Sequence, residues 1–586
     1  MKTSLIKFCL LVTACLLTVP WAGAESTNQA SSKPNIIVVL LDDAGYADLG
    51  CYGGEIDTPN MNRLAQEGLR FRNFYNNARC SPSRASLLTG KESASVGFGA
   101  GTLGGWNREM KLPAYRARLP YQIPTLPELL HGAGYATVMA GKWHLGGSNI
   151  KEGVDRAAQW KNLHPGWELT PEEIESEYNA LPRQRGFDRF FGIITGETHQ
   201  FLVNASDLGN LKSGGATFEE NAYWENNKPA KIRPSQDYTI ASLSSSHPHP
   251  AQGKRLPAWH AADGVTQKAI EMISQEDVVN KPFFLYLSYQ SPHAPREAPQ
   301  ELVDKYTERY QDLASIESNR VKGMVVNKIL PEGFQYMKTF VNEIGANKKP
   351  NKNNDRIANG AAFHAAMMEQ VDHNIGHLVN HLKKQGKFDN TMIMILSDNG
   401  AASDVGDLMN KPYRGCKALL WEGGAKTFCI ASWPKQIPAN SYSDTMGWIG
   451  DIFPTCLEMA GLTYPSEFRG SKLDPLDGRS LLPSLLGKSQ PLIESVFLND
   501  KGQQGMIWKG RWKFLINPGW YAITSKENRT NYELYDLESD PCEVINIADR
   551  QVELVKTLSA LCKEWQEKQG IKDYSELLKI RPDFSK

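Results

Sequence analysis

The sequence carries no excess of charge of either sign, since its 586 residues include 65 Lys and Arg and 65 Asp and Glu. Proteins that bind nucleic acid or an anionic membrane through their overall charge are usually strongly basic. The balanced charge therefore gives no support for either function. An acidic substrate would have to be held by a local site instead.

Long apolar runs are also missing downstream of the N-terminus. Residues 1–24 combine a lysine-containing start, an apolar stretch over residues 8–19 and an A-x-A cleavage pattern at residues 22–24, which predicts a secretory signal peptide. The apolar stretch is short for a membrane span. We therefore expect an exported protein, periplasmic or secreted, with no integral membrane segment after signal removal. Residues 12–15 resemble a lipobox, but a cut before Cys15 would leave a very short apolar stretch, so lipoprotein anchoring is the disfavoured alternative.

Cysteine is scarce, with nine in the chain, of which two leave with the predicted signal peptide. The other seven are Cys51, Cys80, Cys416, Cys429, Cys456, Cys542 and Cys562. An odd number of thiols in an exported protein needs an explanation. If chemistry consumes Cys80, the remaining thiols are enough for up to three disulfides. Buried, unpaired thiols are the alternative.

The sequence also lacks an internal repeat, and no G-x-G-x-x-G pattern follows its first apolar run, which argues against a dinucleotide-dependent oxidoreductase. It contains instead a series of apolar runs separated by helical patterns such as residues 359–384. The runs are residues 36–41, 136–140, 283–289 and 392–396. Continuous apolar runs are typical of strands buried on both faces, so the sequence predicts an α/β fold with a large, mostly parallel sheet covered by helices.

The pattern also divides the chain into parts. Residues 25–34 are polar and predict a flexible leader, and residues 35–488 hold the apolar runs of a main domain. Within that domain, residues 200–255 and 300–355 are polar and poorly periodic, and we expect them to be insertions around an active-site mouth. Residues 489–586 predict a C-terminal α+β subdomain. Its short antiparallel strands are expected at residues 495–498, 505–508, 512–516 and 532–537, before a terminal helix with Leu554, Leu558, Leu561 and Trp565 on one face.

Polar side chains follow each of the four apolar runs. In open α/β sheets, ligands bind beyond the carboxyl ends of the strands. The segments delivered there are residues 42–43, 141–144, 291–293 and 397–400. The hard oxygen ligands among them are Asp42, Asp43, Asp398 and Asn399. Such a set suits Ca²⁺ or Mg²⁺, whereas Zn²⁺ usually recruits more His or Cys, although Asp42 and Asp43 alone could equally cap the turns that follow them.

Residues 80–90 form the most specific segment. Ser81 followed by Pro82 predicts an N-cap and a first helical residue, and Gly90 predicts the end of that helix. Cys80 would then lie at a helix N-terminus, where the partial positive charge favours an anion. Arg84 would lie about one turn along and reach back to the same anion.

The pattern Cys80-x-Pro82-x-Arg84, followed by Ala-Ser-Leu-Leu-Thr-Gly, resembles the signature of the type I, formylglycine-dependent sulfatases in the alkaline-phosphatase-like superfamily. Other blocks resemble the same family in the same order, namely residues 42–43, 141–146, 185–188, 291–293, 397–400, 417, 422–424, 451–455, 477–481 and 535–541. The resemblance covers roughly residues 34–550 and is strongest to bacterial arylsulfatases. Residues 425–428 depart from the Ile-Arg-Val-Pro-like stretch that the family often has there.

The resemblance implies an alkaline-phosphatase-like catalytic domain and a modified nucleophile. In the family, a formylglycine-generating or radical maturation enzyme converts the cysteine at the position of Cys80 to formylglycine (3-oxoalanine). One hydroxyl of the hydrated aldehyde attacks sulfur and releases the alcohol, and the second hydroxyl then loses its proton and expels sulfate. One Ca²⁺, preferred over Mg²⁺, is implied with the ligands Asp42, Asp43, modified Cys80, Asp398 and Asn399.

The resemblance also implies roles for the remaining polar groups. Arg84 orients the hydrated aldehyde. Lys142 and Lys417 hold sulfate oxygens and offset charge in the transition state. His144 is the base for sulfate expulsion, and His293 donates a proton to the leaving oxygen, with Lys417 as a rival donor. The implied activity is hydrolysis of aryl or carbohydrate sulfate esters.

Two alternatives stay open. The first is a formylglycine-dependent phosphodiesterase or phosphonate monoester hydrolase, although Asn399 stands where two-metal phosphatases have a His, which favours one calcium and sulfate. The second is a non-catalytic carbohydrate-binding protein on the same fold, although no catalytic position is lost. The organic half of the substrate is open, because loop aromatics could stack on it but are favoured as loop cores. These aromatics are Trp106, Tyr115, Trp160, Trp167, Tyr223 and Trp224.

Overall fold

A computed structural model describes most of the chain. The described residues are 33–101, 112–147, 179–196, 198, 200, 223–230, 236–242, 255–334, 350–488, 495–500, 504–519 and 530–580. The predicted signal peptide and nearly all of the predicted leader lie outside them. None of the helices in the described part of the chain is long and apolar enough to cross a membrane.

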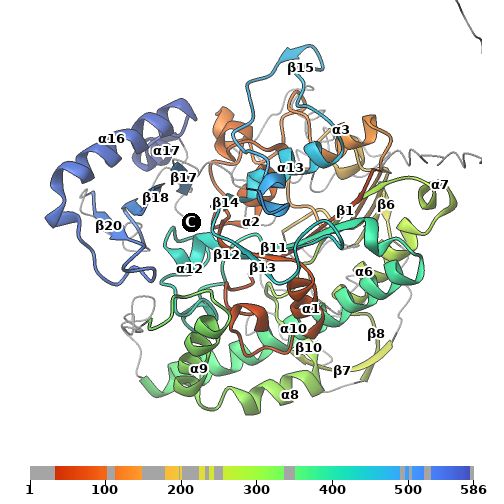
Figure 1. Cartoon of the computed structure of the whole chain (residues 1–586), viewed down its shortest axis with the longest axis horizontal. Helices are drawn as coiled ribbons and strands as arrows, with labels where there is room; N and C mark the ends of the chain where they lie inside the picture. Colours follow the sequence, from red (N-terminus) through yellow and green to blue (C-terminus); the bar gives the residue numbers. More distant parts are fainter. Residues whose placement is uncertain are drawn as a thin grey trace, which may run out of the picture. The chain divides into compact units, whose positions relative to one another are not determined.

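An eleven-stranded sheet carries the fold, and the four predicted apolar runs are its central strands (Figure 1). In order across the sheet they are β11 (Thr391–Ser397), β1 (Asn35–Leu41), β9 (Phe283–Ser288) and β3 (Ala136–Lys142). The four strands run parallel to one another and are fully buried. Leu41 in β1 lies opposite Ser397 in β11. Gly141 in β3 lies opposite Ser288 in β9, so the carboxyl ends of the strands meet at one edge.

The flanking strands make the sheet mixed. β12 (Lys426–Ser432) runs antiparallel to both β11 and β2 (Leu69–Tyr75), whereas β4 (Arg189–Ile193) runs parallel to β3. Short strands complete the edges, namely β13 (Ser441–Ser443) and β14 (Gly447–Trp448) beside β2, and β5 (Trp224–Glu225) and β6 (Lys228–Pro229) beyond β4. The prediction of a large, mixed, mostly parallel sheet is confirmed.

Helices cover both faces of this sheet, as its apolar strands require (Figure 1). In β1, the odd-numbered residues from Ile37 to Leu41 belong to one buried apolar cluster and the even-numbered residues from Ile36 to Leu40 to a second. The first cluster includes residues of α1 (Pro59–Gln66), α6 (Ala261–Ile273), α8 (Gln300–Arg309), α9 (Leu313–Val326) and α10 (Pro350–Lys384). The second includes residues of α2 (Cys80–Thr89), α3 (Leu126–Gly132) and α13 (Ile452–Met459).

The predicted C-terminal sheet is also present. It has four antiparallel strands in sequence order, β17 (Ser495–Asp500), β18 (Gln504–Lys509), β19 (Trp512–Ile516) and β20 (Tyr532–Asp536). The amphipathic helix α16 (Val552–Lys568) packs on it around a small apolar cluster, and α17 (Tyr574–Ile580) follows. The sheet belongs to one compact unit over Pro34–Lys586, and a domain boundary at residue 488 stays a prediction.

The remaining elements are short. They are α7 (Glu276–Val279), α11 (Gly406–Met409), α12 (Glu422–Ala425), α14 (Leu482–Leu485), β7 (Gln236–Ser242), β8 (Arg255–Ala258), β10 (Glu297–Pro299), β15 (Glu467–Phe468) and β16 (Ser471–Lys472). The interpretation of residues 300–355 as an insertion around an active-site mouth stays a prediction, although this poorly periodic stretch contains the regular helices α8 and α9. Those helices bury few apolar residues and carry polar groups such as Arg320 inward, against Glu55, which obscures the helical period.

The start of α2 also differs from the prediction. Ser81 is not the N-cap, because the helix begins at Cys80 and the extended residue before it is Arg79, whose side chain makes no capping bond. The hydroxyl of Ser83, in the first turn of α2, instead accepts a hydrogen bond from the backbone N–H of Asn77 at 2.9 Å. Gly90 ends the helix with a φ of 65°, as predicted.

All seven cysteines that follow the predicted signal peptide are buried, and none of them forms a disulfide in the described part of the chain. The buried-thiol interpretation is therefore confirmed and the three-disulfide alternative was wrong. Tyr115, Tyr223 and Trp224 are likewise buried in apolar clusters, which confirms their interpretation as loop cores. The other three loop tryptophans lie outside the described residues.

Candidate active site

The ends of the central strands bring the predicted polar residues together. Asp42 and Asp43 follow β1, Lys142 ends β3, and Asp398 follows β11. Backbone bonds fix these ends to one another: Asp42 N–H donates to the Ser291 carbonyl at 3.2 Å, and Asp398 N–H donates to the Leu41 carbonyl at 3.0 Å. Asp43 has a φ of 71°, so the chain turns sharply where β1 stops. A left-handed conformation at a non-glycine residue is typical of constrained functional sites.

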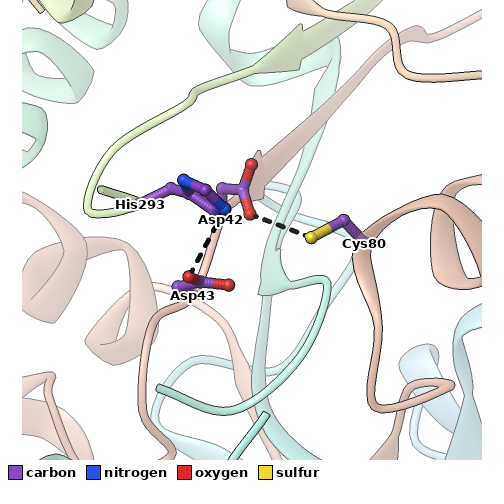
Figure 2. A group of neighbouring side chains, drawn as sticks. All are labelled: Asp42, Asp43, Cys80 and His293. Atoms are coloured by element: carbon purple, nitrogen blue, oxygen red, sulfur yellow. Dashed lines mark hydrogen bonds and ion pairs between the residues drawn. The ribbon is translucent and has the colours of Figure 1, made fainter. Parts of the chain in front are cut away.

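Cys80 enters this group from the N-terminus of α2. Its Sγ lies 3.4 Å from Asp42 Oδ1. One ligand atom from each of Asp42, Asp43, Cys80 and His293 lies within 4.8 Å of the others, as Figure 2 shows. His293 comes from the loop after β9, and its Nε2 lies 3.8 Å from Asp43 Oδ2. The segments after β1 and β9 and the N-terminus of α2 therefore converge on one group of ligand atoms.

Arg84 ties these elements together from inside. Its guanidinium is fully buried and donates to Asp398 Oδ2 from Nε at 3.0 Å and from Nη2 at 2.7 Å. Nη2 also lies 3.3 Å from Asp42 Oδ2. Nη1 donates to the Lys142 carbonyl at 3.1 Å and to the Ser288 hydroxyl. Because one planar group contacts four strand ends, Arg84 fixes the relative positions of the carboxylates.

Two lysines form ion pairs with Asp42 and Asp43. Lys142 Nζ donates to Asp42 Oδ2, and both side chains are completely buried. Lys417 Nζ donates to Asp43 Oδ1 at 2.6 Å and is one-fifth exposed. Burial opposes ionisation of both carboxyls, but the pKa of Asp42 is lowered overall by Lys142, His293 and Arg84. The pKa of Asp43 is lowered in the same way, chiefly by Lys417.

Asp398 differs from its two neighbours. Burial and the charge of Asp42 raise its pKa to about 7, although Arg84 opposes the shift. Three carboxyls packed this closely cannot all ionise freely unless further positive charge is close to them. A divalent cation is the kind of group that supplies such charge.

Asn399 supplies a test of whether these residues suit a metal ion. Its amide nitrogen donates to Asp43 Oδ1 at 2.6 Å and to the Gly400 carbonyl at 2.9 Å. Its Oδ1 is fully buried and has no hydrogen-bond partner in the described part of the chain. A buried amide oxygen without a partner is uncommon. With three carboxylates beside it, this oxygen completes a hard donor set that fits Ca²⁺ or Mg²⁺.

The thiol and the two histidines have displaced pKa values. Burial and Asp42 raise the pKa of Cys80 to about 12, so the unmodified side chain is a neutral thiol and a weak nucleophile. Burial, Lys142 and Arg84 hold the pKa of His144 well below its ordinary value. Burial and Lys417 also lower the pKa of His293, against the pull of Asp43. Both imidazoles are therefore neutral near pH 7 and able to accept a proton.

Every predicted site residue thus lies in or beside one cluster, and two neighbours were missed. Ser288 bridges Arg84 and the Lys142 carbonyl, and as the last residue of β9 it could have been found by the rule applied to the other strands. Gly196 follows β4, and a Cβ there would meet His144 Nε2 at 2.9 Å. The sequence held no signal for Gly196, because the loop contact joins segments that are about 50 residues apart.

Comparison with known proteins agrees with this geometry. The family model described as Sulfatase matches residues 34–462. An arylsulfatase of Klebsiella aerogenes is 27% identical over 495 residues, which are 78% of this chain and 93% of that protein. An N-acetylgalactosamine-6-O-sulfatase of Bacteroides thetaiotaomicron is 27% identical over 566 residues, which are 92% and 94% of the two chains.

A solved structure gives the same result for the fold. The crystal structure of Ps i-CgsB in complex with k-i-k-neocarrahexaose superposes with a TM-score of 0.61 at 23% identity, covering 93% of this chain and 94% of the other. The family match extends over most of the chain and over all the strand ends that meet at Cys80. The chain therefore belongs to the sulfatase family and is a sulfuric ester hydrolase.

Proposed function

We propose that this protein hydrolyses aryl or carbohydrate sulfate esters with a formylglycine made from Cys80 and one bound Ca²⁺. The observation that carries the proposal is the place of Cys80 at the N-terminus of α2, 3.4 Å from a carboxylate of the oxygen donor set. A thiol whose pKa is raised to about 12 is a poor nucleophile there. The same position suits a group that lies beside a cation and receives an anion.

The modified residue and the metal ion would supply distinct chemistry. A hydrated formylglycine at position 80 would offer one hydroxyl for attack and a second whose deprotonation would release sulfate. A bound Ca²⁺ would supply positive charge beside the carboxylates and would polarise a sulfate oxygen. The residues that would hold the ion are Asp42, Asp43, Asp398 and Asn399, together with modified residue 80.

The surrounding cations act on the substrate's charge. Arg84, one turn after residue 80 in α2, fixes the start of this helix to Asp398 through its buried guanidinium. Lys142 and Lys417 form ion pairs with Asp42 and Asp43, respectively. Both are placed to hold sulfate oxygens and to offset negative charge in the transition state. Lys417 is partly exposed, so it is the lysine that an entering ester meets first.

The two neutral imidazoles divide the proton transfers. His144, with its strongly lowered pKa, is the base for sulfate release. His293 lies on the more open side, 3.8 Å from Asp43. It would first accept the proton that the attacking hydroxyl gives up and then deliver that proton to the leaving oxygen. Lys417 is the rival donor, and replacing each of the two separately with esters of good and poor leaving groups distinguishes them.

The proposal has two further parts that concern the protein's surroundings. The signal-like residues 1–24 support export to the periplasm or beyond, and a formylglycine-generating or radical maturation enzyme is required as a partner. The relatives include an arylsulfatase and a sulfatase of N-acetylgalactosamine, which supports testing both ester classes.

The decisive experiment is the mass of the peptide that contains residue 80, measured on protein made with a competent maturation system. A loss of about 18 Da with reactivity toward an aldehyde probe is the expected result. Rates on matched aryl sulfate and aryl phosphate esters should then favour the sulfate. An unmodified thiol in a protein that still cleaves sulfate esters would disprove the formylglycine nucleophile, and faster phosphate cleavage would favour the phosphodiesterase alternative.

A further inference from the structure

Lys417 lies in a loop, residues 414–422, that the main sheet alone does not hold. We call this segment the Lys417 loop. Ala418, the next residue, has a φ of 72°, a conformation that residues with a Cβ rarely adopt. Neighbouring groups must therefore impose this geometry, and they set the direction in which Lys417 leaves the backbone.

Segments that border the main sheet supply two of the bonds. Lys417 N–H donates to the Ala401 carbonyl at 3.0 Å, and Ala418 N–H donates to the Ala78 carbonyl at 2.8 Å. These bonds join the Lys417 loop to the segments after β11 and before α2.

The C-terminal sheet supplies the next bond. Gln504, the first residue of β18, is buried, and its Nε2 donates to the Ala418 carbonyl at 2.9 Å. The peptide groups on both sides of the left-handed residue are thus fixed, one by the segment before α2 and one by the C-terminal sheet. A shift of this carbonyl would rotate the peptide between Ala418 and Leu419 and so change the backbone angles of the residue next to Lys417.

Two other strands of the same sheet also hold the Lys417 loop. From β19, Lys513 Nζ lies 2.8 Å from Glu422 Oε1. From β20, Glu533 Oε2 accepts the indole N–H of Trp421 at 2.8 Å. All these contacts are buried, so the C-terminal sheet forms one wall behind the residue that reaches Asp43.

We propose that Gln504 is a positioning residue for the sulfatase reaction, acting through the Ala418 carbonyl on Lys417. Gln504 then gives this edge of the C-terminal sheet a part in positioning Lys417, a part that the sheet's apolar cluster does not share. This inference rests on the proposed role of Lys417 in holding the sulfate group. A catalytic group displaced by about 1 Å can cost up to about 100-fold in rate.

The test is a double-mutant cycle. Gln504→Met keeps the length of the side chain and removes the donor, and Lys417→Met removes the group on which Gln504 is proposed to act. On 4-nitrophenyl sulfate, Gln504→Met should lower kcat roughly 10-fold to 100-fold in the wild-type background. In the Lys417→Met background the same change should have almost no effect on kcat, because the group through which Gln504 acts is already missing.

Two controls separate positioning from loss of folding. Ile507→Ala on the same strand creates a cavity in the C-terminal apolar cluster and should lower Tm while kcat per folded enzyme stays unchanged. All rates are divided by the fraction of protein that carries modified residue 80, from peptide mass, so that a maturation defect is not counted as a rate defect.

Two outcomes would overturn the inference. Gln504→Met could leave kcat unchanged, or it could lower kcat by the same factor in both backgrounds, and either result shows that Gln504 does not act through Lys417. Wild-type turnover is measured first. Its absence in fully modified protein would contradict the proposed function and this inference together, whereas wild-type turnover with an unaffected Gln504→Met contradicts only the inference.

Discussion

Two buried clusters of charge lie on either side of the Lys417 loop, and they differ in what they leave available. The active-site cluster joins three carboxylates to Arg84, Lys142 and Lys417. The second, which we call the Glu422 cluster, joins Glu422 and Glu543 to Lys513 at distances of 2.8 and 2.9 Å. Both contain charges that are costly to bury.

The two clusters differ in the exposure of their side chains and in whether a buried oxygen lacks a hydrogen-bond partner. Lys417 and His293 at the active site are 20% and 14% exposed, and Asn399 Oδ1 is buried without a partner among the described residues. In the Glu422 cluster, no charged side chain of the three is more than 1% exposed. Buried charge alone therefore does not identify a functional site. The identifying features are an open side and polar atoms that the protein itself does not satisfy.

Removing Cys80 should give the largest effect on activity, because it acts on the active-site cluster and leaves the Glu422 cluster intact. Cys80→Ala removes the proposed nucleophile, so sulfate ester hydrolysis should fall by a factor on the order of 10⁴ or more. The change deletes one small buried atom, so stability should fall by only about 1 kcal/mol. Steady-state assays and thermal unfolding of the same preparations measure both quantities.

The matched control is Cys562→Ala, which removes another buried thiol from α16 in the C-terminal apolar cluster. It should cost a similar free energy of unfolding and leave turnover unchanged. A Cys80→Ala variant that retains its rate would show that the reaction does not pass through this side chain.

Breaking the Glu422 cluster should have the opposite effect to Cys80→Ala, namely a large loss of stability. Lys513→Met leaves Glu422 and Glu543 buried without their shared cation, and breaking a buried pair in this way costs about 3–5 kcal/mol. Urea unfolding followed by circular dichroism measures the change. The control Lys435→Met removes an exposed pair with Asp389 and should change stability by less than about 0.5 kcal/mol. Equal effects of the two variants would mean that the buried pairs contribute little.

The active site could be predicted from the sequence because its residues stand at strand ends. Parallel strands deliver their carboxyl ends to one edge, so Asp42 and Asp398, 356 positions apart in the sequence, could be placed together by position along each run. The same logic covers Lys142 and His293. The motif at Cys80 and Arg84 added the helix N-terminus to that edge.

The Glu422 cluster could not be predicted in this way. Lys513 stands inside β19 between Trp512 and Phe514, where alternation indicates a solvent-facing side chain, yet it is completely buried. Its exposure is decided by the packing of a second sheet against the Lys417 loop, which no local pattern encodes. Gln504 was missed for the same reason.

Removing the metal should have an intermediate effect on stability, and this effect belongs to the active-site cluster alone. Dialysis against a calcium chelator should abolish hydrolysis and lower stability, because ligand at about 100 times its Kd contributes about 2.7 kcal/mol. Added Ca²⁺ should restore both. In Asp398→Asn, which removes one proposed ligand, the same calcium addition should raise Tm much less. A chelated enzyme that keeps full activity would contradict a metal at this site.

The smallest effect expected is a pH dependence that belongs to the Glu422 cluster. Burial and Glu422 raise the pKa of Glu543 from 4.5 to about 7, although Lys513 opposes the shift. The folded state therefore holds a proton that the unfolded chain has already released between these two values. The stability that this proton confers is complete below about pH 4.5 and is lost as the pH rises through about 7.

Glu543→Gln should remove that dependence, so between pH 5 and pH 8 the free energy of unfolding of the variant should gain about 2 kcal/mol relative to the wild type. Urea unfolding at several pH values measures this difference between the variant and the wild type. The control Glu553→Gln, at an exposed position on α16, should show no such change with pH. Parallel curves for Glu543→Gln would show that Glu543 is ionised throughout. Lys513 would then face two full negative charges, and the loss of stability in Lys513→Met should exceed the range expected for a single buried pair.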